Sequence, residues 1–118
     1  MSADILLTSP SVSVIHAPAA NTQAQIVITG RPGFRHVIVG LTVSADAAPA
    51  AAVTFTIVDD TPGQMETFKI PAGAFLPIAI NYNHGIPSAP GASVTATLPA
   101  LGAAVSGVIS LRYVSIRA

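Results

Sequence analysis

The stretch Arg35–Ala45, RHVIVGLTVSA, carries the clearest strand pattern of this chain. One set of alternate positions is aliphatic and consists of Val37, Val39, Leu41 and Val43. The other set is mixed and consists of His36, Ile38, Gly40 and Thr42. Alternate residues of a β-strand point to opposite faces of its sheet. The segment therefore predicts a long strand with one aliphatic face.

Strand patterns of the same kind occur along the rest of the chain, separated by Gly- and Pro-containing turns. They cover Val12–His16, Gln23–Thr29, Val53–Val58, Met65–Ile70, Leu76–Tyr82, Ser93–Leu98 and Val105–Ile116. The Ala-rich stretch 46–52 contains Pro49, which disfavours a helix, and the polar stretch 83–91 predicts a loop. With no convincing helix, about eight strands predict an all-β, single-domain antiparallel β-sandwich that is jelly-roll-like.

Charge is scarce in this chain. Its 118 residues contain 5 Lys+Arg and 5 Asp+Glu, so that 8% are charged, against about 25% in ordinary soluble domains. So few charges indicate that other protein covers much of the surface. The net charge of zero argues against nucleic acid or an anionic membrane as a partner, because both attract basic clusters. No apolar run approaches the roughly 18 residues of a membrane span.

The N-terminal stretch MSADILLTSP is expected to be an extended arm at residues 1–10, followed by the β-sandwich domain at 11–118. It has Asp4 where a signal peptide would be basic, so we do not expect a signal peptide. A free tail seldom carries three large aliphatic residues. We therefore expect Ile5, Leu6 and Leu7 to dock on another protein surface.

The last predicted strand is apolar on both faces. One face carries Val105, Ile109, Leu111 and Tyr113, and the other carries Val108, Val114 and Ile116. A strand covered on both sides in so small a domain indicates a subunit interface or a central strand beneath a loop. Arg112, Val114 and Ile116 are the candidate contact residues. The arginines are also candidates for intersubunit ion pairs, which fix register and partner choice.

No reaction chemistry is visible in the sequence. His16, His36 and His84 lack a metal-ligand spacing. Asp59–Asp60 suits either calcium ligation or the capping of a turn, and the following Pro and Gly favour the turn. Gly30–Gly33 lacks the Lys and Ser/Thr of a phosphate-binding loop, and no serine lies in a G-x-S-x-G elbow. There is no cysteine. We expect no enzymatic activity, no metal and no cofactor.

Two segments carry a resemblance, His16–Thr22 (HAPAANT) and Arg31–Leu41 (RPGFRHVIVGL). Together with the aspartates that end the central strand and the aliphatic last strand, they resemble small all-β structural proteins of tailed bacteriophages. The resemblance spans most of the chain. Where a role is assigned in that family, it is that of capsid decoration (cement) proteins, which are jelly-roll-like and commonly trimeric. The longer apolar arm departs from the family pattern and leaves the docking mode open.

The resemblance implies a structural virion protein, made in the host cytoplasm, that decorates and stabilises a phage capsid by bridging capsid subunits. Its partners would be the major capsid protein and copies of itself, in a homotrimer on the capsid surface. The arm at Ile5–Leu7 would then dock on a neighbouring subunit or on the major capsid protein. The alternative is a tail- or fibre-associated receptor or glycan-binding β module, with Asn81, Tyr82 and His84 as its possible glycan contacts.

Overall fold

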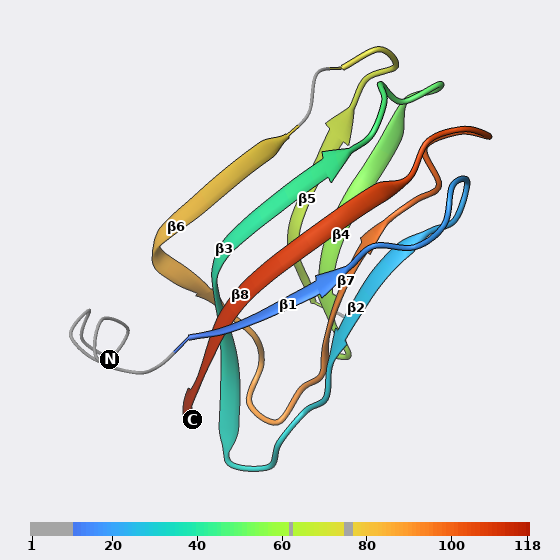
Figure 1. The fold of residues 1–118 in the computed structure, drawn as a ribbon. Coiled ribbons are helices and arrows are strands. Elements are labelled where there is room, and N and C mark those ends of the chain that lie inside the picture. Colours follow the sequence, from blue (N-terminus) through green and yellow to red (C-terminus); the bar gives the residue numbers. More distant parts are fainter. Residues whose placement is uncertain (1–10, 62, 75–76) are drawn as a thin grey trace.

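The computed structural model describes residues 11–61, 63–74 and 77–118. The strands are β1 (Val12–His16), β2 (Ala24–Ile28), β3 (Phe34–Ala45), β4 (Val53–Asp59), β5 (Gln64–Ile70), β6 (Ile78–Pro87), β7 (Val94–Leu98) and β8 (Gly107–Arg117), as drawn in Figure 1. Within the described ranges, no helix is long and apolar enough to cross a membrane. The predicted arm with Ile5, Leu6 and Leu7 lies outside the described residues.

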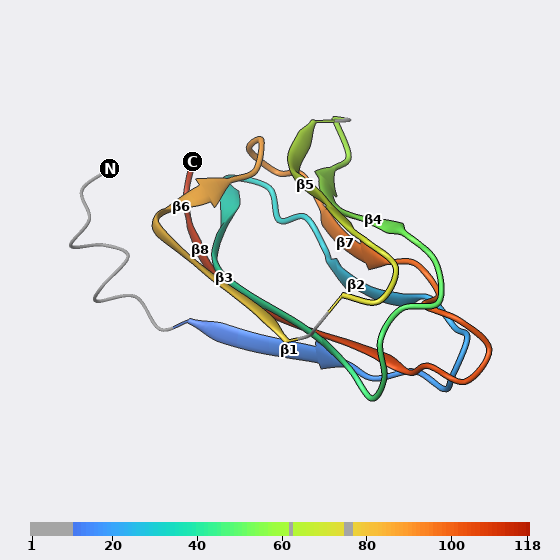
Figure 2. The ribbon, with the colours of Figure 1, turned by 90° about the horizontal axis from the view of Figure 1, so that it is seen from above.

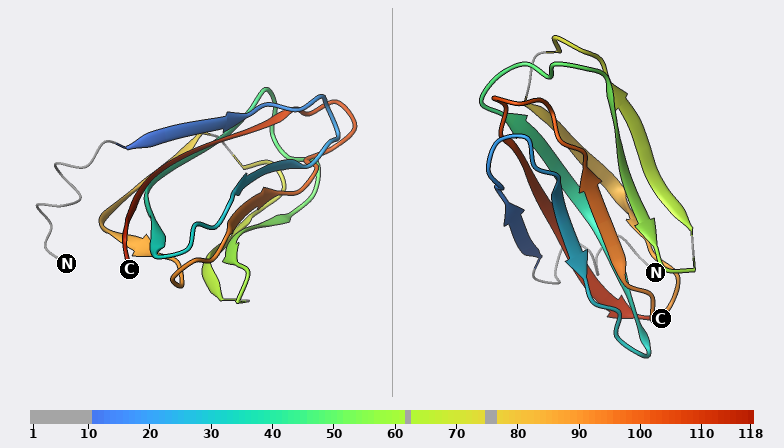
Figure 3. Two further views of the ribbon diagram at one scale, coloured as in Figure 1. Left: turned by 90° about the horizontal axis from the view of Figure 1, so that it is seen from below. Right: turned by 90° about the vertical axis from the view of Figure 1, so that its right-hand side faces the viewer.

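The strands pair as one long hairpin that is folded into two layers. β4 pairs with β5, β3 with β6, β2 with β7 and β1 with β8, all antiparallel. Pairing of β3 with β8 and of β4 with β7 joins them into a first sheet, β1-β8-β3-β6, and a second sheet, β2-β7-β4-β5. Figures 2 and 3 show the two sheets as separate layers. This strand order is that of a jelly roll, which confirms the predicted all-β sandwich.

The core lies between the sheets and is built from the inward positions of the strands. In β2 and β7 every second side chain is buried, and the side chains between them are exposed or half-buried. The rings of Phe55 and Phe68 stack with centroids 4.9 Å apart. Burial of one large apolar side chain stabilises a fold by about 1.5–3 kcal/mol. Burial of the inward apolar side chains, which the alternation in the sequence predicts, is therefore the main stabilising contribution.

A β-bulge at Val39 interrupts the alternation of β3. The register with β8 shifts between Ile38 and Gly40, so that Val39 is an extra residue. Ile38 joins the core together with Leu41, whereas Val37 and Val39 pack on the outer side of the first sheet. The prediction that Val37 and Val39 share one face with Leu41 is therefore wrong, because one inserted residue exchanges the faces of a strand.

β6 is longer than the sequence predicts and includes the start of the polar stretch that was expected to be a loop. Its register with β3 changes between Asn81 and Ile86, so residues 82–85 lie opposite Val39 alone. Gly85 adopts a positive φ of 71° in this segment, a conformation that glycine takes readily. The strand bends there and continues beside β3 (Figure 1).

Asp59, at the end of β4, joins two loops at one end of the sandwich. Its Oδ1 accepts hydrogen bonds from the hydroxyl and the N–H of Thr61 and from the N–H of Gly63, the last at 2.8 Å. Its Oδ2 accepts from the N–H of Ala89, at 3.0 Å, in the loop between β6 and β7. The Thr61 hydroxyl contributes most to lowering the pKa of Asp59 to about 2, and burial opposes it. The Asp59 carboxylate thus caps the N–H groups of the turn after β4, as the sequence predicts.

Candidate functional site

One row of polar side chains crosses the outer face of the second sheet. Thr56 of β4 lies opposite Thr67 of β5 and Thr97 of β7, and Thr97 lies opposite Gln25 of β2. The Gln25 side-chain amide donates to the Thr97 hydroxyl at 3.4 Å. Directly opposite residues have Cβ atoms about 4.5–5.5 Å apart. The row therefore presents hydroxyl and methyl groups next to one another across the whole sheet.

The outer face of the second sheet carries almost no charge. By strand alternation, its side chains are Gln25, Val27, Thr54, Thr56, Val58, Thr67, Lys69, Thr95 and Thr97. We call this set the threonine face. Lys69 is its one charged residue, and Val27 is 58% exposed. A face with so little charge loses less hydration energy than a charged face when protein covers it, and its hydroxyls can still form hydrogen bonds.

Arg112 lies on the outer face of the first sheet, above Gly40. A Cβ atom on Gly40 would lie 2.2 Å from Arg112 Nη2, so glycine leaves the space that the guanidinium occupies. Nη2 donates to Oδ1 of Asn81 at 2.7 Å. The predicted contact residue Arg112 is thus exposed, and its partner within the chain is an amide on β6. Its pairing with an acid of another subunit stays a prediction.

The last strand carries apolar side chains on both faces, as the sequence predicts. Val114 and Ile116 lie on the outer side of the first sheet and cluster with Val37 and Val39. Val114 is 1% exposed and Ile116 is 9% exposed. Within the chain, the cluster already covers both predicted contact residues. Their contribution to a subunit interface stays a prediction.

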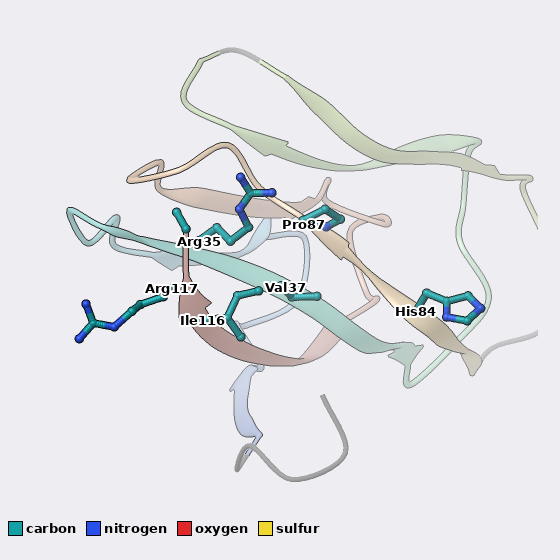
Figure 4. A pocket seen from close by; sticks show the side chains of 7 residues that line it. Arg35, Val37, His84, Pro87, Ile116 and Arg117 are labelled. Atoms are coloured by element: carbon teal, nitrogen blue, oxygen red, sulfur yellow. The ribbon is translucent and has the colours of Figure 1, made fainter. Parts of the chain in front are cut away.

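A pocket of about 350 Å³ opens beside this cluster. It is lined by Arg35, Val37, His84, Pro87, Ile116, Arg117 and Ala118. We call it the basic pocket, because two arginines line it. In the view of Figure 4, Ile116 and Val37 lie between Arg117 at one end and His84 at the other, and Arg35 and Pro87 lie along one side. Nε of Arg35 is buried and has no hydrogen-bond partner among the described residues.

The structure does not bring the possible glycan contacts Asn81, Tyr82 and His84 into one group. Asn81 accepts its hydrogen bond from Arg112 on the outer face. Tyr82 packs against the core, and its hydroxyl donates to Glu66 at 3.0 Å. Burial, and then the Glu66 carboxylate, raise the pKa of Tyr82, which keeps the phenol neutral. His84 lines the basic pocket.

The other two histidines have hydrogen bonds that hold the sandwich together. His36 is buried, and its Nε2 donates to the Thr29 carbonyl at 2.8 Å, while its Nδ1 lies 2.8 Å from the Ser115 hydroxyl. His16 Nδ1 accepts from the N–H of Gln25 at 2.9 Å and so connects β1 to β2. In the part of the chain that the structure describes, no three His, Cys, Asp or Glu side chains could hold a metal ion.

Sequence reasoning missed both the threonine face and the basic pocket. The signal for the first is present, because Thr54 and Thr56 alternate with apolar residues, as do Thr95 and Thr97. Such alternation predicts a polar outer face on each strand, but the cross-strand row depends on the strand order. The pocket combines residues from β3, β6 and β8 with the C-terminal residue. No local motif predicts that combination.

No protein-family model matches the chain, and no curated protein matches it in sequence. Among solved structures, carbohydrate-binding module CBM36 in complex with calcium and xylotriose is 8% identical, covers 90% of this chain and 93% of its own, and has a TM-score of 0.41. A chain from the particle of the extra small virus of the prawn Macrobrachium rosenbergii is 8% identical and has a TM-score of 0.30. That match covers 90% of this chain and 79% of the viral chain. Infectious bursal disease virus (Gx strain) is 16% identical, with 92% and 32% covered and a TM-score of 0.31. These similarities concern the all-β fold alone.

Proposed function

We propose that this protein is a structural virion protein that decorates and stabilises a bacteriophage capsid by bridging capsid subunits. The observation that carries the proposal is the threonine face, a surface with Lys69 as its one charge that extends across all four strands of the second sheet. The resemblance of the HAPAANT and RPGFRHVIVGL segments to tailed-phage structural proteins supports it. The partners are the major capsid protein and copies of this chain, in a homotrimer on the capsid surface.

The distribution of charge fits this role. Many of the exposed charged residues lie in turns and at strand ends, among them Arg31, Asp46, Asp60 and Arg117. The exceptions are Arg112, on the outer face of the first sheet, and Lys69, on the threonine face. Sorting charge away from a sheet face leaves that face free to be buried at low desolvation cost. A standard interface buries about 800 Å² on each partner, with about one hydrogen bond per 100–200 Å². Threonine hydroxyls can supply bonds at that density without any ionised group.

In this role the protein acts by adding contacts, not by catalysing a reaction. Each bound copy buries surface at a junction between capsid subunits, so that opening of the shell must also break those contacts. The symmetric lattice repeats the contact many times, which makes a modest interface sufficient. No catalytic group, metal or cofactor is required.

Substitution of both Thr56 and Thr97 by lysine tests the proposal. Two charges buried at the interface should weaken binding to capsids that lack this protein by about thirtyfold, which corresponds to ~2 kcal/mol. Co-sedimentation with purified capsids measures the effect. The matched control is Thr42→Lys, on the outer side of the first sheet, which should bind like the unmodified protein.

The opposite pattern, with Thr42→Lys defective and the double variant normal, would assign docking to the first sheet and overturn the proposed face. A receptor module has a different signature. Joint replacement of Asn81, Tyr82 and His84 by alanine should leave host adsorption unchanged. Loss of adsorption with normal capsid binding would favour the receptor alternative.

A further inference from the structure

We propose that the basic pocket is a binding site for an organic carboxylate with a compact apolar body. The site is independent of the capsid role, because that role rests on the threonine face of the other sheet. Its grounds are the arginine at the pocket wall, the apolar floor beside it, and the hydrogen bonds that hold both in place. A free acid and the carboxyl end of a polypeptide share this chemistry, and the experiment below separates them.

The register of the first sheet brings an arginine and apolar side chains together on its outer face. Arg35 of β3 lies opposite Ile116 of β8, and Val37 of β3 lies opposite Pro87 of β6. Alternation along β3 puts Arg35 and Val37 on the same side of the sheet, and directly opposite residues share a face. In Figure 4 the Arg35 side chain lies beside Pro87, next to Val37 and Ile116. The pocket thus has a cationic wall and an apolar floor.

Arg35 has an unused donor at this wall. Its side chain is half-buried, and its Nε is buried without a hydrogen-bond partner among the described residues. A buried donor without a partner is unfavourable. A guanidinium can give two parallel hydrogen bonds to one carboxylate, and such charged bonds are stronger than neutral ones. A carboxylate paired with Nε and one Nη of Arg35 would therefore satisfy this donor.

The surroundings of the pocket are positively charged. Arg117 lines its end, and the guanidinium carbons of Arg31 and Arg117 lie 3.9 and 5.7 Å from the centre of the Phe34 ring, next to Arg35 in the chain. Among the described residues that line the pocket, none is Asp or Glu. Asp59 is engaged by its turn and by the loop after β6. An anion approaching the pocket is thus attracted by several guanidinium groups.

The apolar floor selects the kind of anion. A phosphate group has hydrated oxygens on all sides, and the oxygens that face aliphatic side chains would lose water without gaining a partner. A carboxylate has its oxygens on one side, so its hydrocarbon body can pack on Val37, Pro87 and Ile116. The pocket volume of about 350 Å³ is near the lower end of the range for ligand sites. It therefore suits a small body.

Hydrogen bonds hold the walls of the pocket. The N–H of Ser88 donates to the carbonyl of His36 at 2.8 Å, and the N–H of His36 donates to Ser88 Oγ at 3.1 Å. These two bonds fix the end of β6, and with it Pro87, against β3. The N–H of Ala118 donates to the carbonyl of Gly33 at 2.9 Å and holds the end of β8. A pocket held in this way needs little ordering when a ligand binds.

Titration of the full chain with two carboxylates tests the site. The probes are isocaproate, a free branched acid, and N-acetylleucine, which mimics the carboxyl end of a polypeptide. Heteronuclear NMR follows the Nε–H signal of Arg35, and calorimetry measures the affinity. We expect the tighter of the two acids to move that signal. Acetate, which lacks the apolar body, should bind at least about tenfold more weakly, and inorganic phosphate should leave the signal in place.

The relative affinities of the two acids identify the source of the carboxylate. Tighter binding of isocaproate points to a free acid, and tighter binding of N-acetylleucine points to the carboxyl end of a polypeptide.

Variants locate the site. Arg35→Met keeps the length of the side chain but removes the guanidinium, so it should weaken binding at least about tenfold, and its missing signal assigns the Nε–H resonance. Arg35→Lys keeps the charge but lacks the fork of donors, so it should also bind more weakly. The matched control Arg112→Met makes the same charge change on the outer face of the same sheet, where Arg112 donates to Asn81. It should bind like the unmodified protein, and circular dichroism confirms that each variant is folded.

An Arg35 Nε–H signal that neither acid moves would overturn the proposal. Equal affinity of the Arg35→Met variant and the unmodified protein would place the ligand elsewhere and would also overturn it. Phosphate that binds as tightly as the acids and moves the same signal would contradict the role of the apolar floor. Capsid co-sedimentation does not enter these measurements, so failure of this site and failure of the capsid role are distinguishable.

Discussion

Replacement of Asp59 by alanine is expected to lower the free energy of unfolding by about 3 kcal/mol. The buried carboxylate accepts hydrogen bonds from Thr61, Gly63 and Ala89, and its side chain is 6% exposed. Its removal leaves those donors without partners at the end of the sandwich where two loops meet. Urea denaturation measures the change. The control Asp60→Ala, on an exposed neighbour, should change stability by less than about 0.5 kcal/mol.

The same carboxylate makes stability depend on pH in a defined direction. The pKa of Asp59 falls from 3.8 to about 2 in the folded state. A depressed folded pKa means that the charged form stabilises the fold above the unfolded pKa, and that this stabilisation is lost as the pH falls from about 4 towards 2. The Asp59→Ala variant should therefore show a flatter loss of stability over that range. Equal acid sensitivity of both proteins would contradict the assigned role.

Replacement of Gly30 by alanine is expected to cost about 3 kcal/mol or to prevent folding. The added Cβ would lie 2.2 Å from the carbonyl oxygen of Gly91 and 2.9 Å from the backbone of Ala92. These are backbone atoms, so no side-chain rotation relieves the overlap. The N–H of Gly30 also donates to Ser93 Oγ at 2.7 Å, which fixes the turn against the loop after β6.

Gly33 provides the matched control for Gly30. It has a positive φ of 79° but no atom within 4 Å of the added Cβ, so Gly33→Ala should cost only about 1 kcal/mol. Thermal and urea denaturation of the two variants compare the effects. Equal costs at both positions would contradict the close approach of the two loops.

The fold could be predicted from the sequence because the strands are short, alternating and separated by Gly and Pro. Each predicted strand corresponds to one of the eight observed strands, and the Ala-rich stretch around Pro49 forms no strand or helix. Local alternation does not reveal an inserted residue, however. The bulge at Val39 therefore exchanged the faces of the first half of β3, and the extra residues of β6 opposite it were not predicted.

The candidate sites depended on the strand order and were predicted only in part. Thr56, Thr67 and Thr97 form one row because β5, β4 and β7 are neighbours in that order. Arg35 and Arg117 reach the same pocket because β3 pairs with β8. The sequence alone shows that charged residues are scarce. The structure adds that one whole sheet face is nearly free of charge.

The central claim is that the threonine face docks on a capsid. Cryo-electron microscopy of capsids saturated with the purified protein tests it most directly. We expect density for the jelly roll at junctions between capsid subunits, with β2, β7, β4 and β5 facing the shell. Density with the first sheet against the shell, or capsids that remain bare at saturating protein, would contradict the account.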